Sequence, residues 1–369
     1  RGAEVFPAAP HPYEAVFSPP VPAPRAEAPS GLPELRLRTL YIQQQGAHVG
    51  QHGGRLVISK GPQALLDLPA HHVDQLFLFG RVHLSAAAMA FCLARGLPVY
   101  LFSGRGHYYG TLLSDAGSLF QVKLAQYRLL DQGERRLAAA TAIVRGKVAN
   151  AAALLRRHDH NHPETGLAGS IQALSDFCRR AAPEDLAILR GYEGAAAATY
   201  FAGFGKCMRG PLQFAHRNRR PPTDPVNSLL SFGYTLLLRH VQSALAARGM
   251  DPVVGVYHES GRGHPALASD LLEELRAPVV DSLVVTLANR RQLVPDDFYF
   301  ETGTPQPCLL KDEARARFLQ AFENKLAETV AHPEMEKPVD WRRIIELQAN
   351  RMRRFLLGET DTYVPYTWE

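Results

Sequence analysis

The strongest constraint on the fold is a change of sequence pattern near residue 120. Between residues 35 and 115, short apolar runs are bounded by Gly and Pro, which is typical of β-strands. An Ala-rich stretch from Ser85 to Arg95 interrupts them with one short helix. We expect a small sheet or sandwich, whose strand-like runs are Leu37 to Val49, Gly54 to Ser59, His72 to Phe79 and Leu97 to Phe102.

From about residue 120 onward the pattern is helical. Asp340 suits the N-cap and Gly358 the position after the C-cap of a last helix. The sequence therefore predicts a small β domain at 35–115 followed by a larger helical domain at 120–369. The Ala- and Leu-rich helical segments are 119–132, 134–158, 167–180, 184–204, 225–248, 265–276, 281–290 and 313–331.

The first 34 residues differ from the rest. They hold nine prolines and show no periodicity, so PPVPAPRAEAPSGLP is expected to be a stiff, extended linker or tail. The chain also begins at Arg1 rather than Met. We interpret it as a domain cut from a longer polypeptide, with a disordered tail and a processed start as the alternative.

Composition excludes several protein classes. The chain has 369 residues, with 46% hydrophobic and 21% charged, as in globular proteins. No apolar run has the length of a membrane helix, and the first residues show no signal-peptide pattern. The four cysteines form no CxxC pair, so we expect no zinc ribbon or disulfide framework, and a cytoplasmic location. The formal charge of +5 permits a polyanionic partner but does not require one.

Glu193 is an unusual residue in the predicted helix 184–204. Pro183 suits the first helical position. Glu193 falls in the middle of an apolar stripe, where a carboxylate is costly unless it is paired or binds a cation. The two interpretations, a cation ligand and a buried ion pair with an arginine, stay open at this point. The stripe is formed by Leu186, Leu189, Ala196 or Ala197, Tyr200 and Phe204.

A second candidate site lies in VYHESGRGHPALASDLLEELRAP, residues 256–278. His258 precedes a Gly-rich turn, and Pro265 can open a helix. Asp270 and Glu273 are three residues apart, so they share one face of that helix. A histidine with two carboxylates suits Mn²⁺ or Mg²⁺. Glu274 points about 100° away and is expected to be solvated.

A third segment is a basic loop after residue 205. It contains five cations and no acid, and it can neutralise backbone phosphates. The alternative is a solvated loop with no partner. Asp224 is expected to cap the following helix. The cations are Lys206, Arg209, Arg217, Arg219 and Arg220. A further motif, HDHNH at 158–162, is expected to be a solvated loop.

Three ordered motifs resemble one known family. LRGYEGAAAATYF, RNRRPPTDPVNSLLSFGYTLL and HESGRGHPALASDLLEELRAP look like the CRISPR-associated integrase family, also called CRISPR-associated protein one. The resemblance covers roughly residues 36–330. It implies an α+β protein with a small N-terminal β-sandwich domain and a larger all-α catalytic domain.

The resemblance also implies a metal-dependent site. The family's metal ligands fall on Glu193, His258 and Glu273, with Asp270 as a further ligand or as a residue that supports one. The implied cofactor is Mg²⁺ or Mn²⁺. The implied reaction inserts short DNA duplexes into a CRISPR array by attack of a 3′-hydroxyl on a phosphodiester. The alternatives are a nuclease that only hydrolyses branched or single-stranded DNA, and a non-catalytic DNA-binding scaffold.

Partners follow from the same resemblance. It implies a homodimer that binds spacer-precursor DNA and the CRISPR repeat, together with a small ferredoxin-like adaptation subunit. Some members are fused to an upstream iron–sulfur exonuclease. The Pro-rich start would suit the linker of such a fusion, so we expect a fused or associated exonuclease and no membrane partner.

Overall fold

A computed structural model describes residues 39–114, 120–180, 183–219, 221–259, 261, 264–303 and 305–368. The predicted linker at 1–34 lies outside the described residues. The chain divides into two compact units. The described part of the first covers 39–102 and 109–114, and that of the second covers 103–108 and the residues from 120 on.

The first unit contains two four-stranded sheets, in the orders β4-β3-β2-β6 and β1-β5-β7-β8. In the second of these sheets β5 lies between β1 and β7 and is parallel to both. In the other sheet β2 is antiparallel to β3 and parallel to the short β6. The elements are β1 (Thr39–Ile42), β2 (His48–His52), β3 (Arg55–Lys60), β4 (Gln63–Pro69), β5 (Gln75–Phe79), β6 (His83–Leu84), α2 (Ala86–Ala94), β7 (Val99–Phe102) and β8 (Tyr108–Leu112).

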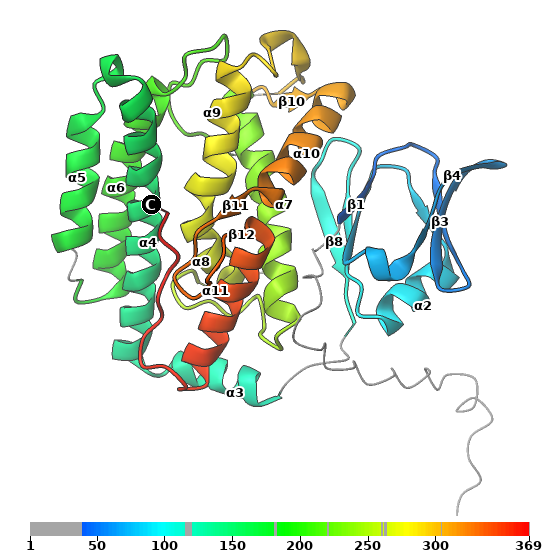
Figure 1. Ribbon diagram of the computed structural model, residues 1–369, viewed down its shortest axis with the longest axis horizontal. Helices are drawn as coiled ribbons and strands as arrows, with labels where there is room; N and C mark the ends of the chain where they lie inside the picture. Colours follow the sequence, from blue (N-terminus) through cyan, green and yellow to red (C-terminus); the bar gives the residue numbers. More distant parts are fainter. Residues whose placement is uncertain are drawn as a thin grey trace, which may run out of the picture. The chain divides into compact units, whose positions relative to one another are not determined.

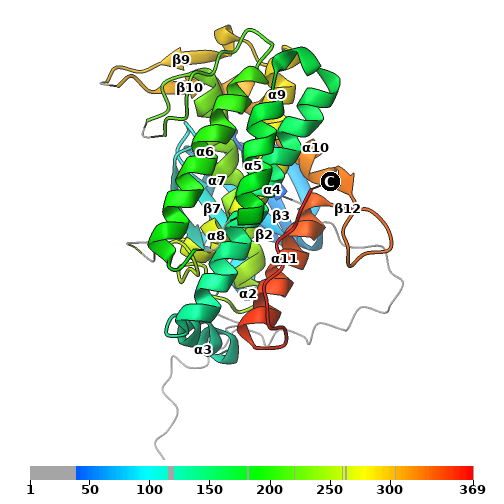
Figure 2. The ribbon, with the colours of Figure 1, turned by 90° about the vertical axis from the view of Figure 1, so that its left-hand side faces the viewer.

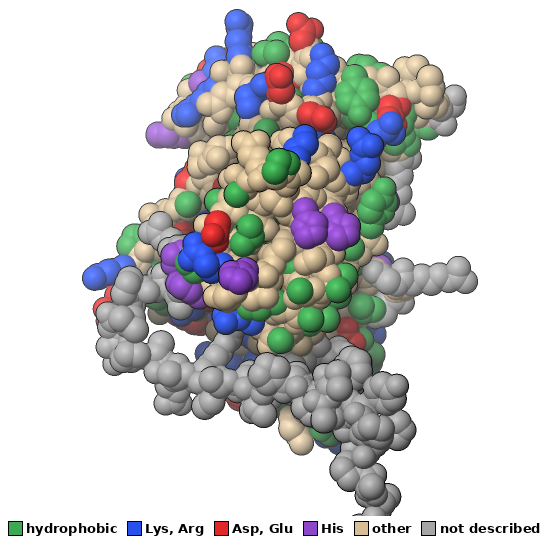
Figure 3. Space-filling model, turned by 90° about the vertical axis from the view of Figure 1, so that its right-hand side faces the viewer, with side chains coloured by type: hydrophobic (Ala, Val, Ile, Leu, Met, Phe, Trp, Pro, Cys, Tyr) green, Lys and Arg blue, Asp and Glu red, His purple; other side chains and the backbone are tan. Residues whose placement is uncertain are grey.

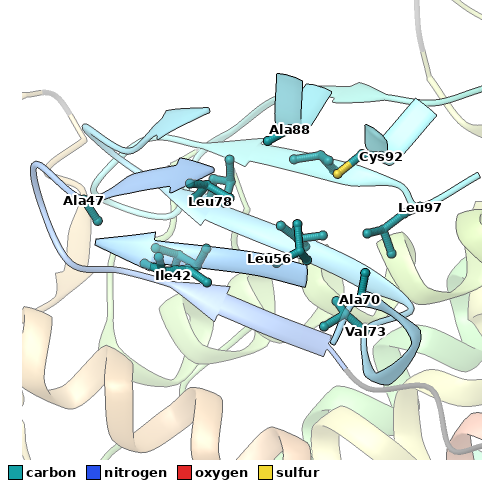
Figure 4. Close-up of a cluster of buried hydrophobic side chains, with 13 residues drawn as sticks. Ile42, Ala47, Leu56, Ala70, Val73, Leu78, Ala88, Cys92 and Leu97 are labelled. Atoms are coloured by element: carbon teal, nitrogen blue, oxygen red, sulfur yellow. The ribbon is translucent and has the colours of Figure 1, made fainter. Parts of the chain in front are cut away.

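Side chains from both sheets and from α2 share one core (Figure 4). On β3, Leu56 and Ile58 are buried and alternate with less buried neighbours, as the two-residue period of a strand requires. Leu78 of β5 and Cys92 of α2 join the same cluster. The sequence did not predict β4, because its residues are largely exposed and give no apolar alternation; backbone pairing with β3 holds it.

The second unit is mainly helical (Figure 1). Its long helix α4 packs against α5, α6 and α8. Asp340 caps α11 by accepting from the Arg343 N–H, and Gly358 adopts a φ of 75°, as expected for a residue that ends a helix. The helices are α3 (Phe120–Leu129), α4 (Gly133–Asn161), α5 (Ala168–Arg180), α6 (Leu186–Lys206), α7 (Pro225–Ala246), α8 (Ala266–Leu275), α9 (Ser282–Asn289), α10 (Asp312–Ala327) and α11 (Trp341–Leu356).

The fold class is confirmed: a β region precedes a mainly helical part. The helical part also carries two short two-stranded sheets that the sequence did not predict, because strands of two or three residues have no readable period. They pair β9 (Phe298–Phe300) with β10 (Cys308–Leu310), and β11 (Thr329–Val330) with β12 (Val339–Asp340).

Two local predictions are wrong. Helix α6 does not begin at Pro183, because Asp185 is its N-cap and accepts from the Ile188 N–H. The HDHNH motif is not a solvated loop, since residues 158–161 form the last turn of α4 and His158 is buried. The helix continues until just before Pro163, whose ring cannot occupy a helix interior.

Helix α4 is also long and apolar enough to cross a membrane, by length and composition, and no other helix among the described residues passes this test. Two thirds of its apolar window (67%) is buried within the protein. Burial by neighbouring helices accounts for this composition, since a core helix is hydrophobic on most of its surface.

Helices α8 and α9 are joined by a widened π-helical turn, Arg276–Asp281. Pro278 lies within it and has no N–H to donate, which disfavours a regular α-helical ladder there. Such widened turns occur frequently at functional sites. This one places both of its charged ends, Arg276 and Asp281, at the cavity described below.

Candidate metal centre and cavity of the helical unit

A cavity of about 290 Å³ lies within the helical unit. Helices α4, α6, α7 and α8 and the π-helical turn line it. Its wall contains two of the predicted ligands, Glu193 and Glu273, together with Lys147 of α4. Residues separated by up to 134 positions in the chain therefore meet at one place, with Lys147 and Asp281 at the extremes.

Glu193 lies on the inner side of α6, one turn before the buried Ala196. Its side chain is 24% exposed and forms an ion pair with the Lys147 ammonium. The sequence left open an ion pair with arginine, but the partner is lysine. Because this pair borders a cavity, Glu193 is both paired and accessible to a ligand.

Glu273 of α8 is the more deeply buried carboxylate, with 3% of its side chain exposed. Lys147 Nζ lies 2.7 Å from its Oε2, and Arg276 Nη1 lies 3.0 Å from its Oε1. Burial by itself would raise the pKa of Glu273, but Arg276, Lys147 and His258 outweigh burial and lower it to about 2. Glu273 is therefore ionised at neutral pH despite its burial.

His258 is held by Asp270, which is fully buried. One oxygen of Asp270 accepts from the Val256 and Tyr257 N–H groups, at 2.6 and 3.0 Å. The other accepts from the His258 N–H at 2.9 Å and lies 2.7 Å from His258 Nδ1. Since four donors already surround Asp270, its contacts favour support of His258 over direct binding of a cation.

This arrangement leaves the other ring nitrogen of His258 directed at the site. His258 Nε2 lies 3.7 Å from Glu273 Oε1. With Nδ1 donating its proton to Asp270, Nε2 carries the lone pair that a metal ligand needs. The structure thus brings together Glu193, His258, Asp270 and Glu273, the four candidate site residues from two separate sequence motifs.

The donor set fits a divalent cation. No group of three His, Cys, Asp or Glu side chains in the described residues is already arranged to hold a metal ion. Instead the Lys147 ammonium forms ion pairs with the carboxylates of both Glu193 and Glu273. Glu273 Oε2 is buried and lacks a hydrogen bond of good geometry even so. Two carboxylates and one imidazole suit Mg²⁺ or Mn²⁺.

Glu274 is not solvated, contrary to the prediction from sequence. It is fully buried, and its carboxylate accepts from Tyr363 Oη at 2.6 Å and from the Tyr366 N–H at 2.6 Å. The helical wheel correctly placed it on a different face from Glu273, but that face is covered by the segment after α11. A polar residue on the outer face of a helix is exposed to solvent only where no other element packs against that face.

A second polar cluster lines the same cavity, and the sequence did not indicate it. Asp281 accepts from Tyr200 Oη and Tyr234 Oη, both at 2.5 Å. Burial raises the pKa of Asp281 to about 6, although these hydroxyls and the nearby Arg276 and Arg217 oppose the increase. The cluster joins α6, α7 and the π-helical turn behind the candidate metal centre.

The predicted basic loop divides into two parts. Arg217 and Arg219 line the cavity, and Arg217 donates to Asn227 Oδ1 at 2.6 Å. Lys206 and Arg209 lie elsewhere: Lys206 donates to the Gly166 carbonyl, and Arg209 lies against His162 and Glu164. Arg220 lies outside the described residues. Only Arg217 and Arg219 are therefore placed beside the candidate centre.

The surface gives no broader basic patch on the face that Figure 3 shows. There, among the described residues, Lys and Arg side chains are scattered between acidic and apolar ones. On this face, the net charge of +5 does not gather into a site for nucleic acid.

Lys147 is the main residue that sequence reasoning missed. It lies in IVRGKVANAAALLRR, where the flanking Val144, Val148 and Ala151 are buried. A lone cation on an apolar helical face is costly without a partner, by the argument that singled out Glu193. Each signal marks a charge that needs a partner, but neither one identifies the other residue, because the two helices are far apart in the chain.

Comparison with known proteins gives a consistent family match. The family model described as CRISPR associated protein Cas1 matches residues 40–324. The CRISPR-associated endonuclease Cas1 1 of Thermus thermophilus is 39% identical over 332 residues, covering 89% of this chain and 99% of that protein. A Cas4 exonuclease/Cas1 endonuclease fusion of Geobacter sulfurreducens is 36% identical, and the match covers 88% of this chain but 59% of the fusion.

Solved structures share the fold. A casposase bound to integration product superposes with a TM-score of 0.77 at 22% identity, covering 90% of this chain and 95% of that one. A chain of a Cas6-RT-Cas1 and Cas2 complex gives a TM-score of 0.79 at 23% identity, covering 92% of this chain and 37% of that one. At these identities the likeness concerns the fold alone.

Proposed function

Because this chain belongs to the Cas1 family of CRISPR-associated proteins, as its match over residues 40–324 establishes, we propose that it is a metal-dependent endonuclease and integrase. It inserts short DNA duplexes into a CRISPR array. The observation that supports this proposal is the meeting of Glu193, Glu273 and His258 around the Lys147 ammonium.

In this proposal Glu193, Glu273 and His258 Nε2 hold one Mg²⁺ or Mn²⁺. The cation supplies charge neutralisation and polarisation of the scissile phosphate. Lys147 is the counter-charge of the two carboxylates. Asp270 fixes the ring orientation and the tautomer of His258.

The DNA is held by Arg217 and Arg219, whose guanidinium groups can pair with backbone phosphates. The nucleophile is the 3′-hydroxyl of the incoming duplex. Its oxygen forms a bond to phosphorus of the repeat strand while the bond to the strand's own 3′-oxygen breaks. The proton lost by the nucleophile is balanced by the one gained by the leaving oxygen. Because one phosphodiester forms as another breaks, the reaction needs no hydrolysis of a nucleoside triphosphate.

Partners belong to the same proposal. We infer a homodimer in the cytoplasm that works with a small ferredoxin-like subunit. The complex of a fold relative with Cas2 supports such a subunit. A fused or associated exonuclease is supported by the Cas4/Cas1 fusions among the relatives.

The deciding experiment follows joining rather than cutting. The purified chain is incubated with Mn²⁺ or Mg²⁺, a labelled duplex with free 3′ ends and a supercoiled plasmid bearing a repeat, with and without the partner subunit. Covalent joining that requires the cation, Glu193 and a free 3′ end is the expected result. The controls are Glu193→Ala and a 3′-blocked duplex.

Other outcomes select the alternatives. DNA that is cut but never joined would indicate a nuclease that only hydrolyses. If wild type and Glu193→Ala behave alike while melting at similar temperatures, the catalytic assignment is wrong and a DNA-binding scaffold is the better account.

A further inference from the structure

The segment that follows α11 returns to the helices that carry the candidate metal centre. Residues 363–368 are extended and lie beside α4 (Figures 1 and 2, red). Tyr363 and Tyr366 are almost fully buried. The segment also lies beyond residue 324, where the family match ends.

The segment is attached to α8 through Glu274. Tyr363 Oη and the Tyr366 N–H each donate to the Glu274 carboxylate at 2.6 Å, and Gln348 of α11 donates to it at 3.1 Å. These donors are neutral, so the contact is a hydrogen-bonded attachment rather than an ion pair. A fully buried carboxylate needs such partners, and losing one costs more than a surface hydrogen bond would.

The same segment is attached to α4 through Asn150. The Asn150 amide donates to the Glu274 carbonyl at 2.6 Å and to the Tyr366 carbonyl at 2.9 Å. Its oxygen accepts from the Trp368 N–H at 2.6 Å. One buried amide therefore joins α4, α8 and the segment.

Close packing adds a steric contact at Gly146. A Cβ atom at Gly146 would lie 2.5 Å from Pro365 Cβ, a separation that side-chain atoms do not adopt. The absence of a side chain lets the segment lie directly on the backbone of α4.

The attachment points are the sequence neighbours of the site residues. Gly146 precedes Lys147, and Glu274 follows Glu273. Adjacent helical residues point about 100° apart and are offset by about 1.5 Å along the axis. An element that holds Gly146 and Glu274 in place therefore also constrains their chain neighbours Lys147 and Glu273, whose side chains point about 100° away.

We propose that residues 363–368 are a positioning strap, which sets the separation of Lys147 from Glu273 across the candidate metal centre. It does so by holding α4 and α8 at Gly146, Asn150 and Glu274. The strap's effect on cation binding rests on the proposed function, whereas its effect on the two helices does not.

The test uses two phenol-to-phenyl substitutions in the full chain. Tyr363→Phe removes the hydroxyl that donates to Glu274. Tyr366→Phe is the matched control, because its hydroxyl donates to the Ala331 carbonyl while its N–H contact with Glu274 is kept. Both variants keep their rings, and a melting curve verifies that both fold.

The first readout is binding of Mn²⁺ alone by titration calorimetry. Tyr363→Phe should bind Mn²⁺ about tenfold more weakly, because a displaced Glu273 should cost as much as the loss of a residue that orients a metal ligand. Tyr366→Phe should stay within about twofold of wild type. The second readout is hydrogen exchange of the backbone amides in α4 and α8, which should quicken in Tyr363→Phe and not in Tyr366→Phe.

The outcomes are separable. If both variants melt at lower temperature but leave Mn²⁺ affinity and exchange at α4 and α8 unchanged, the segment only covers the core and the strap proposal is wrong. If wild type binds no Mn²⁺ and exchange still distinguishes the two variants, the strap stands and the metal proposal fails.

Discussion

Two adjacent glutamates on different faces of α8 have pKa values that shift in opposite directions. Glu273 and Glu274 are both almost fully buried. The pKa of Glu273 is lowered to about 2, since Arg276, Lys147 and His258 outweigh the cost of burial. Burial raises the pKa of Glu274 to about 7, and the hydroxyl and amide donors around it only partly offset this. Burial alone thus does not decide ionisation; the charge of the neighbouring groups does.

The difference in pKa matches two different roles, a proposed metal ligand for Glu273 and a structural contact for Glu274. The ionised Glu273 borders the cavity and can bind a cation. The Glu274 carboxylate is enclosed by hydrogen-bond donors of α11 and of residues 363–368, so its role is to attach these elements to α8. Four substitutions test this difference, and they follow in order of decreasing expected effect.

Glu273→Gln should reduce the rate of DNA joining by about 10²- to 10³-fold, because it removes a charged group that acts where charge develops in the reaction. Initial rates of joining at saturating Mn²⁺ would measure this. The melting temperature and DNA affinity of the variant serve as controls. Near-normal joining by a folded variant would remove Glu273 from the site.

Lys147→Met should lower the free energy of unfolding by about 3 kcal/mol in the absence of divalent cations, since it leaves Glu193 without its cation and Glu273 with only Arg276 and His258. Urea unfolding would measure the loss. Saturating Mn²⁺ should restore much of it, because a cation at the two carboxylates replaces the ammonium. An equal loss with and without Mn²⁺ would argue against a shared cation position.

The pH dependence of stability should separate the two glutamates. Because the folded pKa of Glu273 is about 2, below its ordinary 4.5, its stabilisation is present above pH 4.5 and lost as the pH falls towards 2. The folded pKa of Glu274 is about 7, above 4.5, so its contribution is present below pH 4.5 and lost as the pH rises to about 7.

Unfolding curves of wild type, Glu273→Gln and Glu274→Gln across this range would test the signs. Each substitution should change the slope by up to about 1.4 kcal/mol per pH unit within its own window. Slope changes of the same sign in both variants would contradict the comparison.

Arg190→Gln measures how much an exposed ion pair contributes to the free energy of unfolding, for comparison with the buried pairs of Lys147. Arg190 pairs with Glu259 at 2.7 Å, but their side chains are 43% and 77% exposed. Its loss should change the unfolding free energy by less than about 0.5 kcal/mol, because solvent screens exposed pairs. Chemical denaturation at low and high salt would verify this, and an effect as large as that of Lys147→Met would show that burial is not what distinguishes the two pairs.

Local sequence signals predicted most of the elements. Apolar periodicity gave the long helices, and Asp224 and Asp340 were correctly identified as caps, since a capping side chain acts on a backbone N–H three residues away. The same signals failed where structure depends on pairing alone, as in β4 and in the two- and three-residue strands of the helical part.

The site was predicted unevenly for the same reason. Glu193, His258, Asp270 and Glu273 could be singled out because a charge on an apolar face, or two acids on one helical face, is locally anomalous. Their roles beside a cation stay a prediction. The partners Lys147 and Arg276 were missed, as was the Asp281 cluster with Tyr200 and Tyr234, because contacts between distant helices leave no fixed spacing in the chain.

Residue patterns along the chain are enough to identify the long helices, the charges at apolar positions and the family motifs. Packing between distant elements sets which of two neighbouring glutamates faces cations and which faces neutral donors. Helical periodicity specifies the direction of a side chain around its own axis, whereas its environment depends on the element that packs there. For Glu274 that element is the segment at 363–368, about 90 residues further along the chain.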